Sequence, residues 1–329
     1  MIISRTPMRV SFVGGGSDLP LHYRKNGGAV VSAAINKYVF ITVNKRFDST
    51  IRVSYSKTEE VPEAKDVEHK LVRAALTKLD IHNGIEITSI ADIPSSGSGL
   101  GSSSAFTVGL LNSLYAYRGA YRSKADLAAE ACMVELDLCK EPIGKQDQYG
   151  AALGGLNLIR FHPDESVSSE PVIGPPGFVD QFQNSLLMFY TGATRSASQL
   201  LIKQMEGMQR EQAMADTVTR MAAMTEDFST AIRSGNYGAV GALLHEGWVL
   251  KRSISTVSNE LIEDMYRRAR SAGALGGKIL GAGGGGFLLV MAEPENHDRV
   301  RNALKEFRCV PFRFDWNGST IIFYNPAQE

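Results

Sequence analysis

The sequence lacks the features that mark secreted and membrane proteins. Its 329 residues include only three cysteines, which cannot all pair within one chain, and none lies in a CxxC or Cys/His array. We therefore expect reduced thiols, as in cytosolic proteins. No apolar run reaches the roughly 18 residues of a membrane span. Residues 1–7 show no basic segment followed by an apolar stretch, so we expect no signal peptide. These absences predict a soluble, cytoplasmic protein.

An excess of charge of either sign is also missing. The 35 Lys and Arg residues balance the 35 Asp and Glu residues. The chain therefore lacks the electrostatic footprint of a nucleic-acid-binding protein or of a protein that binds an anionic membrane surface. We expect small-molecule ligands instead. The oligomeric state is left open, and a homodimer is one option.

What the sequence has in excess is glycine, with 32 residues that gather in three places. Hydrophobic residues make up 43% and charged residues 21%, which is ordinary for a globular protein. At about 150 residues per domain, the length predicts two domains. A chain of this length can bury a large core without disulfides or metal ions.

The hydrophobic patterns mix strands and helices without regular βαβ alternation, which predicts an α+β fold. Strands are expected at residues 8–13, 29–35, 38–47, 51–55, 84–90, 156–161, 186–190, 278–280, 286–291 and 320–323. Helices are expected at residues 66–79, after residue 104, from Ser123 until Pro142 ends that helix, from 196 to 272 with breaks near Gly235 and Ser258, and at 299–307. Ser123 and Asp126 resemble a capping box, and Leu127, Ala131, Val134 and Leu138 align on one face of the helix that follows.

Residues 94–105, PSSGSGLGSSSA, carry the most specific signal. Glycine lets a backbone turn sharply and approach an anion closely. The serines then open a helix, whose unpaired N–H groups and dipole favour negative charge. A flexible linker is the alternative, but a linker does not run directly into a strongly periodic helix. This segment predicts a phosphate-binding loop.

Two better-known phosphate motifs are excluded. A Walker A loop needs a hydroxyl residue after its Gly-Lys pair, and Ile279 stands there in the sequence GGKI. Residues 281–286, GAGGGG, match GxGxxG, but a predicted strand follows where a dinucleotide-binding fold requires a helix. We expect this run to be a loop between two strands that lines a site.

Two further segments carry charged residues beside glycines. Residues 14–18, GGGSD, follow a strand and end in Asp18, for which an ordinary tight turn is the alternative. Residues 141–150, EPIGKQDQYG, place Lys145 and Asp147 after a helix, where a solvated ion pair is the alternative.

Taken in their order along the chain, the four segments resemble the motifs of the GHMP kinases. These are small-molecule kinases related to galactokinase, homoserine kinase and mevalonate kinase. The resemblance runs from Thr6 to about Phe287. Galactokinases carry Gly-Glu-His where this chain has three glycines at 14–16. The three-glycine motif and the segment at 141–149 together resemble the D-glycero-D-manno-heptose 7-phosphate kinase branch. The same two segments are also similar to those of the fucokinase-like members. The resemblance implies two domains, residues 1–170 and 171–329, with the active site in the cleft between them.

The resemblance also implies roles for individual residues. Asp147 would be the catalytic carboxylate, assisted by Arg9 and by Lys145. Mg²⁺ would be held by Ser103 and Glu135, while Glu130 and Asp137 are taken as solvated acids. The ATP phosphates would lie on the loop formed by Ser96, Gly97, Ser98, Gly99, Leu100, Gly101, Ser102, Ser103 and Ser104. The substrate would contact Gly15, Gly16, Ser17, Asp18, Asp147, Gly283 and Gly284, with Arg195, Lys251 and Arg252 as cations for a substrate phosphate.

The implied reaction is phosphorylation of the anomeric C1 hydroxyl of a heptose 7-phosphate by ATP. Its product would feed a nucleotide-activated heptose of the GDP-heptose type, used in a capsule or lipopolysaccharide. Two alternatives stay open. One is a kinase of the same family for a free sugar such as fucose or galactose. The other is a catalytically silent sugar sensor on the same fold.

Overall fold

Two antiparallel-rich sheets organise the molecule, which we describe from a computed structural model covering residues 1–93, 97–192, 197–254 and 257–325. The larger sheet has the order β12 (Thr320–Tyr324), β1 (Ile2–Val13), β2 (Gly28–Lys45), β5 (Ile85–Ala91), β3 (Ile51–Ser54) and β4 (Thr58–Val61). Strands β6 (Leu156–Phe161) and β7 (Val167–Pro171) branch from β2. The smaller sheet has the order β11 (Arg308–Cys309), β8 (Leu186–Tyr190), β10 (Phe287–Ala292) and β9 (Ala274–Ile279).

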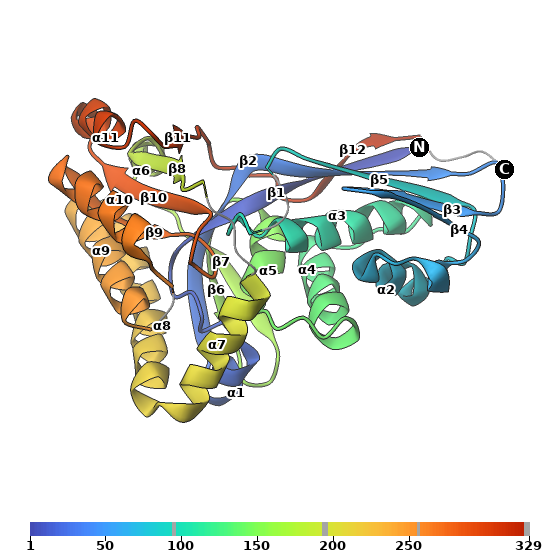
Figure 1. Cartoon of the computed structure of the whole chain (residues 1–329), viewed down its shortest axis with the longest axis horizontal. Helices are drawn as coiled ribbons and strands as arrows, with labels where there is room; N and C mark the ends of the chain where they lie inside the picture. The colour runs from blue at the N-terminus through green and yellow to red at the C-terminus, as the bar shows by residue number, and fades with distance from the viewer. Residues whose placement is uncertain (94–96, 193–196, 255–256, 326–329) are drawn as a thin grey trace.

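Strand β2 joins two strands that the sequence predicted separately. It runs without interruption for 18 residues. Its first half pairs with β6 and its second half with β5, while β1 lies along both halves. The β1–β2 register shifts at Pro7/Met8, as expected where proline removes a ladder donor, and again between Ser11 and Val13. This long strand bends and runs from the middle of the molecule to the end where both chain termini are marked (Figure 1).

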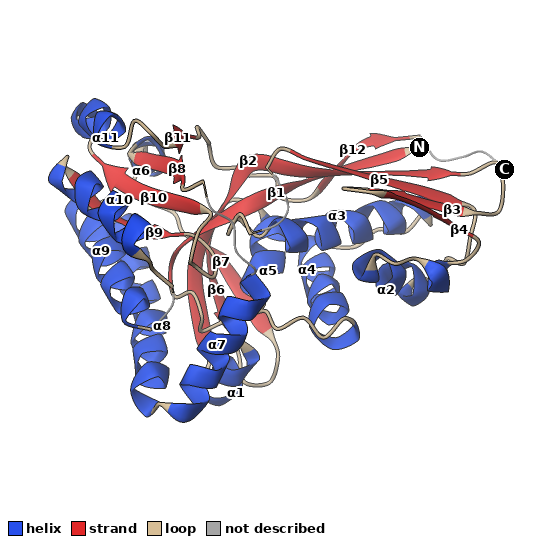
Figure 2. Cartoon of the chain, in the orientation of Figure 1, coloured by secondary structure: helices blue, strands red, loops and turns tan. Residues whose placement is uncertain are grey.

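The helices of the first half gather on one face of the larger sheet (Figure 2). They are α2 (Lys70–Lys78), α3 (Ser102–Tyr117), α4 (Lys124–Cys132) and α5 (Gln146–Leu153). Helix α3 packs against both β1 and β2. The sequence predicted one apolar face for it, but 12 of its 16 residues are buried. The reason is that α3 also packs against α2, α4 and α5, which bury its other sides. Short α1 (Pro20–Asn26) was not predicted.

The second half supplies helices α6 (Phe178–Asn184), α7 (Ala197–Arg210), α8 (Gln212–Arg233), α9 (Tyr237–Ser253), α10 (Glu260–Ser271) and α11 (His297–Ala303). The predicted break near Gly235 is confirmed. Gly235 lies between α8 and α9 and has a φ of +69°. The break near Ser258 is confirmed as well, because α10 begins just after it. Helix α9 packs on β9, so one helix backs the smaller sheet directly behind the glycine-rich loop between β9 and β10.

A π-helical turn, Met133–Leu138, follows α4. The predicted cap is confirmed, because the Ser123 hydroxyl oxygen accepts a hydrogen bond from the Asp126 N–H. The predicted apolar stripe is wrong at its end. The wider turn rotates Leu138 outward, where it is 51% exposed, and Leu136 packs against the core instead. Single π turns are often found at functional sites, and this one contains Glu135.

Strand β12 returns to the larger sheet and pairs with β1. The predicted division at residue 170 stays a prediction. The pairing shows, however, that the last strand of the chain completes the sheet that the first strand began. The largest hydrophobic cluster likewise takes side chains from both halves of the sequence, including Val31 and Phe228.

Candidate active site

The four glycine-rich or charged segments meet around a cavity of about 360 Å³. Strand β1 contributes Arg9 and Ser11, and the turn after it contributes residues 15, 16 and 18. The lining also includes residues 97–99 and 101–104, residues 141, 143, 144, 146 and 147, and residues 281 and 282. From the second half, α7 adds Leu201 and Gln204, and α9 adds Lys251. Both halves of the sequence therefore build one cavity.

The phosphate loop runs directly into α3, as the sequence predicted. Its glycines at 97, 99 and 101 have φ of +70°, +76° and +73°, values that L side chains rarely adopt. The first turn of α3 begins at Ser102, so the N–H groups that open this helix lie beside the cavity. Leu100 differs from its neighbours, because its side chain is buried in the core and its carbonyl accepts the Arg9 N–H at 3.0 Å. Ser96 lies outside the described residues.

The loop at residues 281–286 packs against the phosphate loop. A Cβ on Gly99 would lie 2.4 Å from the Leu280 carbonyl oxygen, and one on Gly281 would lie 2.5 Å from the Gly99 Cα. Only glycine permits this approach of two backbones. Gly283 and Gly284 do not line the cavity but pack beside Val257, so their predicted substrate contact stays a prediction.

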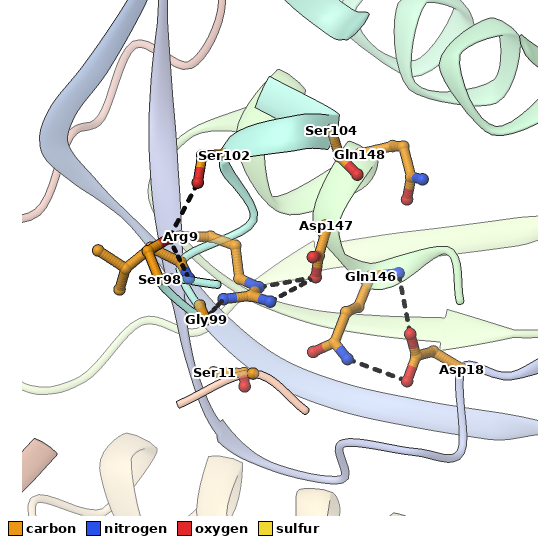
Figure 3. A network of polar contacts seen from close by, with 12 residues as sticks. Arg9, Ser11, Asp18, Ser98, Gly99, Ser102, Ser104, Gln146, Asp147 and Gln148 are labelled. Carbon is orange, nitrogen blue, oxygen red and sulfur yellow. Dashed lines mark hydrogen bonds and ion pairs between the residues drawn. The ribbon is translucent and has the colours of Figure 1, made fainter. Parts of the chain in front are cut away.

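Asp147 and Arg9 form the best-defined ion pair in the cavity (Figure 3). The Arg9 Nε and Nη2 atoms lie 2.8 Å and 2.6 Å from Asp147 Oδ1, and Nη1 donates to the Gly99 carbonyl at 2.6 Å. Arg9 thereby links the carboxylate to the phosphate loop. A Cβ on Gly101 would lie 3.2 Å from the Asp147 carboxylate, which places this carboxylate beside the first turn of α3.

Asp18 is buried at another side of the cavity. It accepts hydrogen bonds from the Gly16 N–H and the Gln146 side-chain amide, each at 3.0 Å, and from the Gln146 N–H at 3.3 Å (Figure 3). Burial, and then the charge of Asp147, raise the pKa of Asp18 above its usual range. Ser17 does not face the cavity, because its hydroxyl donates to the Gly14 and Ala29 carbonyls and so serves the turn. Gly15 and Gly16 do line it.

Glu135 lies fully buried beneath the start of α3. Its carboxylate accepts hydrogen bonds from Ser104 at 2.8 Å, Thr107 at 3.0 Å and Ser103 at 3.4 Å, and from the Gln148 amide. Burial raises the pKa of Glu135 to about 7. Ser103 lines the cavity, so this cluster joins the phosphate loop to the π turn. Sequence reasoning missed Thr107 and Gln148, which read as ordinary helix residues.

The competing acids are placed differently. Asp137 is exposed, as predicted. Glu130 is not simply solvated, because it accepts a hydrogen bond from Tyr115 and pairs with Lys78 and Arg122. Its partners tie α4 to α3 and α2. Among the described residues, no cluster of three or more His, Cys, Asp or Glu side chains has metal-site geometry.

Two of the predicted cations that the structure describes do not reach the cavity. The Lys145 ammonium turns away to Glu165, 2.6 Å from Oε2, and lies over the Tyr23 ring, so the structure does not bring this predicted catalytic residue to the cavity. Arg252 pairs with Glu263 at 2.8 Å on the surface, away from the residues that line the cavity. Arg195 lies outside the described residues. Lys251 does reach the cavity, where it is buried and donates to the Gly281 carbonyl at 2.5 Å. Burial lowers the pKa of Lys251 to about 8.

A second cavity of about 420 Å³ adjoins the first. The two share Ser102 and Ser103. The His69 ring lies between the rings of Tyr55 and Phe106, with centroid separations of 4.7 Å and 5.0 Å, and all three residues line this cavity. No sequence motif marked these aromatic residues, since they come from three separate elements.

Comparison with protein families decides the classification. The model for the GHMP kinase N-terminal domain matches residues 67–155, and the model for the GHMP kinase C-terminal domain matches residues 228–308. The chain belongs to the GHMP kinases. The two matches include the phosphate loop, Glu135, Asp147 and the glycine loop before β10. They also confirm the kinase class that the sequence resemblance implied.

Individual GHMP kinases resemble the chain over most of its length. It is 28% identical to a D-glycero-alpha-D-manno-heptose 7-phosphate kinase of Campylobacter jejuni, with 93% of each chain covered. It is 26% identical to a bifunctional fucokinase/GDP-fucose pyrophosphorylase of Arabidopsis thaliana, covering 91% of this chain and 31% of that protein. The structure of a D-glycero-D-manno-heptose 1-phosphate kinase from Bacteroides thetaiotaomicron superposes with a TM-score of 0.78 at 24% identity, covering 97% and 98% of the two chains. This superposition confirms the two-domain α+β fold. No helix in the described ranges is long and apolar enough to cross a membrane.

Proposed function

We propose that this GHMP kinase transfers the γ-phosphoryl group of ATP to the anomeric C1 hydroxyl of a sugar phosphate of the D-glycero-D-manno-heptose 7-phosphate type. The observation that carries the proposal is the Asp147–Arg9 pair beside the first turn of α3, in a cavity that also holds Asp18. The similarity to the Campylobacter jejuni heptose 7-phosphate kinase supports the choice of substrate. The sugar phosphate would be supplied by a reaction that phosphorylates the far end of the sugar.

The nucleotide would occupy both cavities. Its phosphates fit the N–H groups of residues 98–104 and the positive end of α3. Its adenosine then fits the second cavity, because the two cavities share Ser102 and Ser103. The aromatic rings of Tyr55 and Phe106 and the imidazole of His69 offer flat surfaces to a purine. Lys70 follows His69 in the chain and lines the first cavity, where it pairs with Glu141.

The oxygen donors for Mg²⁺ fit the family expectation. Mg²⁺ prefers hard oxygen ligands and commonly takes only one or two from the protein. Ser103 faces the cavity, and the Glu135 carboxylate lies 3.4 Å from its hydroxyl. We therefore assign Ser103 and Glu135 as the residues that would hold the ion. When bound, Mg²⁺ supplies charge neutralisation to the phosphate oxygens.

The chemical step needs positioning and charge stabilisation more than covalent chemistry. The substrate C1 hydroxyl attacks the γ-phosphorus, the new O–P bond forms, and the bond to the β–γ bridging oxygen breaks to release ADP. Asp147 accepts a hydrogen bond from the attacking hydroxyl and takes its proton. Arg9 holds Asp147 in place and adds positive charge beside the phosphate loop. Asp18 accepts hydrogen bonds from the sugar hydroxyls, for which an ionised carboxylate is well suited.

A screen by coupled ADP release tests the proposal. The acceptors are D-glycero-D-manno-heptose 7-phosphate, the unphosphorylated heptose, fucose and galactose, and ³¹P NMR identifies the phosphorylated position. We expect the highest kcat/KM for the 7-phosphate, with a product that carries an anomeric phosphate. If the free heptose reacts as well as its 7-phosphate, the enzyme is a free-sugar kinase. If no acceptor releases ADP above the Asp147→Asn background, the catalytically silent sensor replaces the proposal.

A further inference from the structure

Two lysines near the active site are buried without an acidic partner. Lys251 on α9 is 6% exposed and Lys278 on β9 is 3% exposed. In the described part of the chain, neither ammonium lies within 4.0 Å of a carboxylate oxygen, whereas Arg9 is paired with Asp147. Lys251 donates to the Gly281 carbonyl, and Lys278 makes one long contact of 3.5 Å with the Ser11 hydroxyl. Buried charges are costly unless an opposite charge compensates them.

Lys251 lines the cavity, and Lys278 reaches it through its contact with Ser11. Helix α9 packs on β9, and burial followed by the charge of Lys251 lowers the pKa of Lys278 well below its usual range. Ser11 lies two residues after Arg9 on β1, so both side chains project from the same face of the strand, and both line the cavity. The charge of Asp18 favours protonation of both lysines, but its carboxylate is bonded by Gly16 and Gln146 and contacts neither ammonium. Asp147 is paired with Arg9. The missing counter-charge is therefore one that a ligand would bring.

We infer that Ser11, Lys251 and Lys278 form an anion subsite that holds a phosphate group carried by the acceptor substrate. This inference rests on the proposed function and extends it to two residues that no sequence motif marked. Lys251 faces the cavity and would contact the phosphate directly. Lys278 is a positioning residue. Because it donates to the Ser11 oxygen, the Ser11 hydroxyl proton is left to donate into the cavity.

A phosphate dianion would balance the positive charge of two ammonium groups. A sugar hydroxyl is neutral and would not. The ATP γ-phosphate is the other source of such a dianion. The observations favour the acceptor, because the phosphate loop, the start of α3 and Arg9 already supply donors and positive charge for the nucleotide. The two lysines come from the smaller sheet and its helix, not from the phosphate loop or α3.

The experiment compares wild type with Lys278→Met, Lys251→Met, Ser11→Ala and the exposed-lysine control Lys305→Met. Steady-state kinetics give KM for heptose 7-phosphate, for the free heptose and for ATP. We expect KM for the 7-phosphate to rise about 10- to 100-fold in the two subsite lysine variants, the loss expected for one charge-assisted hydrogen bond. Ser11→Ala should show a smaller rise, because a neutral donor is lost. KM for ATP and for the free heptose should change less than about twofold, and Lys305→Met should match wild type.

A binding measurement keeps this inference separate from the proposed function. With a non-hydrolysable ATP analogue filling the nucleotide site, we expect inorganic phosphate to raise the Tm of wild type and of Lys305→Met, but not that of Lys278→Met. If wild type prefers the free heptose yet shows this phosphate-dependent Tm, the proposed substrate is wrong and the anion subsite stands. If phosphate leaves the wild-type Tm unchanged, the subsite is wrong whatever the substrate. If the lysine variants raise KM for ATP instead, the two lysines serve the γ-phosphate and the inference is overturned.

Discussion

Arg9 holds Asp147 through two guanidinium nitrogens on one carboxylate oxygen, so Asp147 keeps its position before any substrate arrives. Replacing Asp147 with Asn preserves its shape and removes the proton acceptor. A positioned base contributes on the order of 10²–10⁴-fold, so we expect kcat to fall within that range and KM for ATP to stay nearly unchanged. Steady-state kinetics check this. A variant that keeps more than about half of its kcat would show that Asp147 is not the base.

Lys251 gives the clearest pH prediction. Burial lowers its pKa to about 8, so its charge is lost as pH rises through that value. If the ammonium binds the acceptor phosphate, kcat/KM for the sugar phosphate falls above pH 8, by up to about tenfold per pH unit. The profile of kcat/KM between pH 6.5 and 9.5 measures this. In Lys251→Met the fall near pH 8 should be absent, and its persistence there would assign the titration to another group.

The same lysine predicts a change in stability. The folded-state pKa of about 8 lies below the ordinary value of 10.5, so between these pH values the unfolded chain binds more protons and wild-type stability rises with pH. Below pH 8 the full cost of the buried charge is present. We therefore expect Lys251→Met to raise the free energy of unfolding at pH 7 by about 1–3 kcal/mol, after the lost bond to Gly281 is counted. Urea unfolding should show this gain shrinking by pH 9.5, and a constant gain would indicate a packing effect.

At the scale of elements, the π turn after α4 directs Glu135 rather than Glu130 toward the phosphate loop. We expect Ser103→Ala and Glu135→Gln each to raise the Mg²⁺ concentration needed for half-maximal rate, because each removes a hard oxygen donor. Titrating Mg²⁺ at saturating ATP measures this.

Glu130→Gln and Asp137→Asn are the matched controls on the same helical segment. Neither should change the Mg²⁺ requirement. Glu130→Gln should lower Tm instead, because it weakens the contacts with Tyr115, Lys78 and Arg122. A large Mg²⁺ effect at Glu130 would mean that the assignment of Glu135 as a ligand is wrong.

Local chemistry made some elements predictable and tertiary packing made others unpredictable. The predicted bounds of β6 and β8 match the structure to the residue, and the Ser123 cap began α4 as expected. The π turn was missed because the apolar residues of this segment have the sequence spacing of an ordinary α-helix. The continuity of β2 was missed because its two halves have different partners, β6 and β5, which only the assembled sheet reveals.

The same distinction applies to the candidate site. Glycine spacing identified the phosphate loop, and the family resemblance pointed to Asp147, Arg9 and Glu135, whose side chains the structure places at or beside the cavity. The family resemblance did not distinguish cations that reach the cavity from cations that pair with acids elsewhere. Lys145 and Arg252 find Glu165 and Glu263, residues that are distant in sequence or on a neighbouring helix. Lys278 was passed over because its importance lies in burial without a carboxylate partner, which a sequence does not display.

At the scale of the whole molecule, the two sheets meet where their glycine loops meet. The phosphate loop leads into α3 on the larger sheet, and residues 281–286 join β9 to β10 on the smaller sheet. Gly99 takes φ +76°, and a Cβ there would lie 2.4 Å from the Leu280 carbonyl oxygen. An added methyl group must therefore separate the two loops. The cavity is built from both sheets, so this separation would alter the ATP site as well as the stability of the fold.

Gly99→Ala and Gly177→Ala separate backbone strain from this close approach. Gly177 has φ +78° with nothing within 4 Å of an added Cβ. Its replacement should cost only the left-handed strain, about 1–2 kcal/mol, and leave KM for ATP unchanged. Gly99→Ala adds the clash with Leu280, so we expect a larger loss of unfolding free energy and a rise in KM for ATP of at least about tenfold. Urea unfolding and steady-state kinetics on both variants measure the difference. Equal losses of stability with unchanged KM in both would show that the contact between the two glycine loops does not shape the nucleotide site.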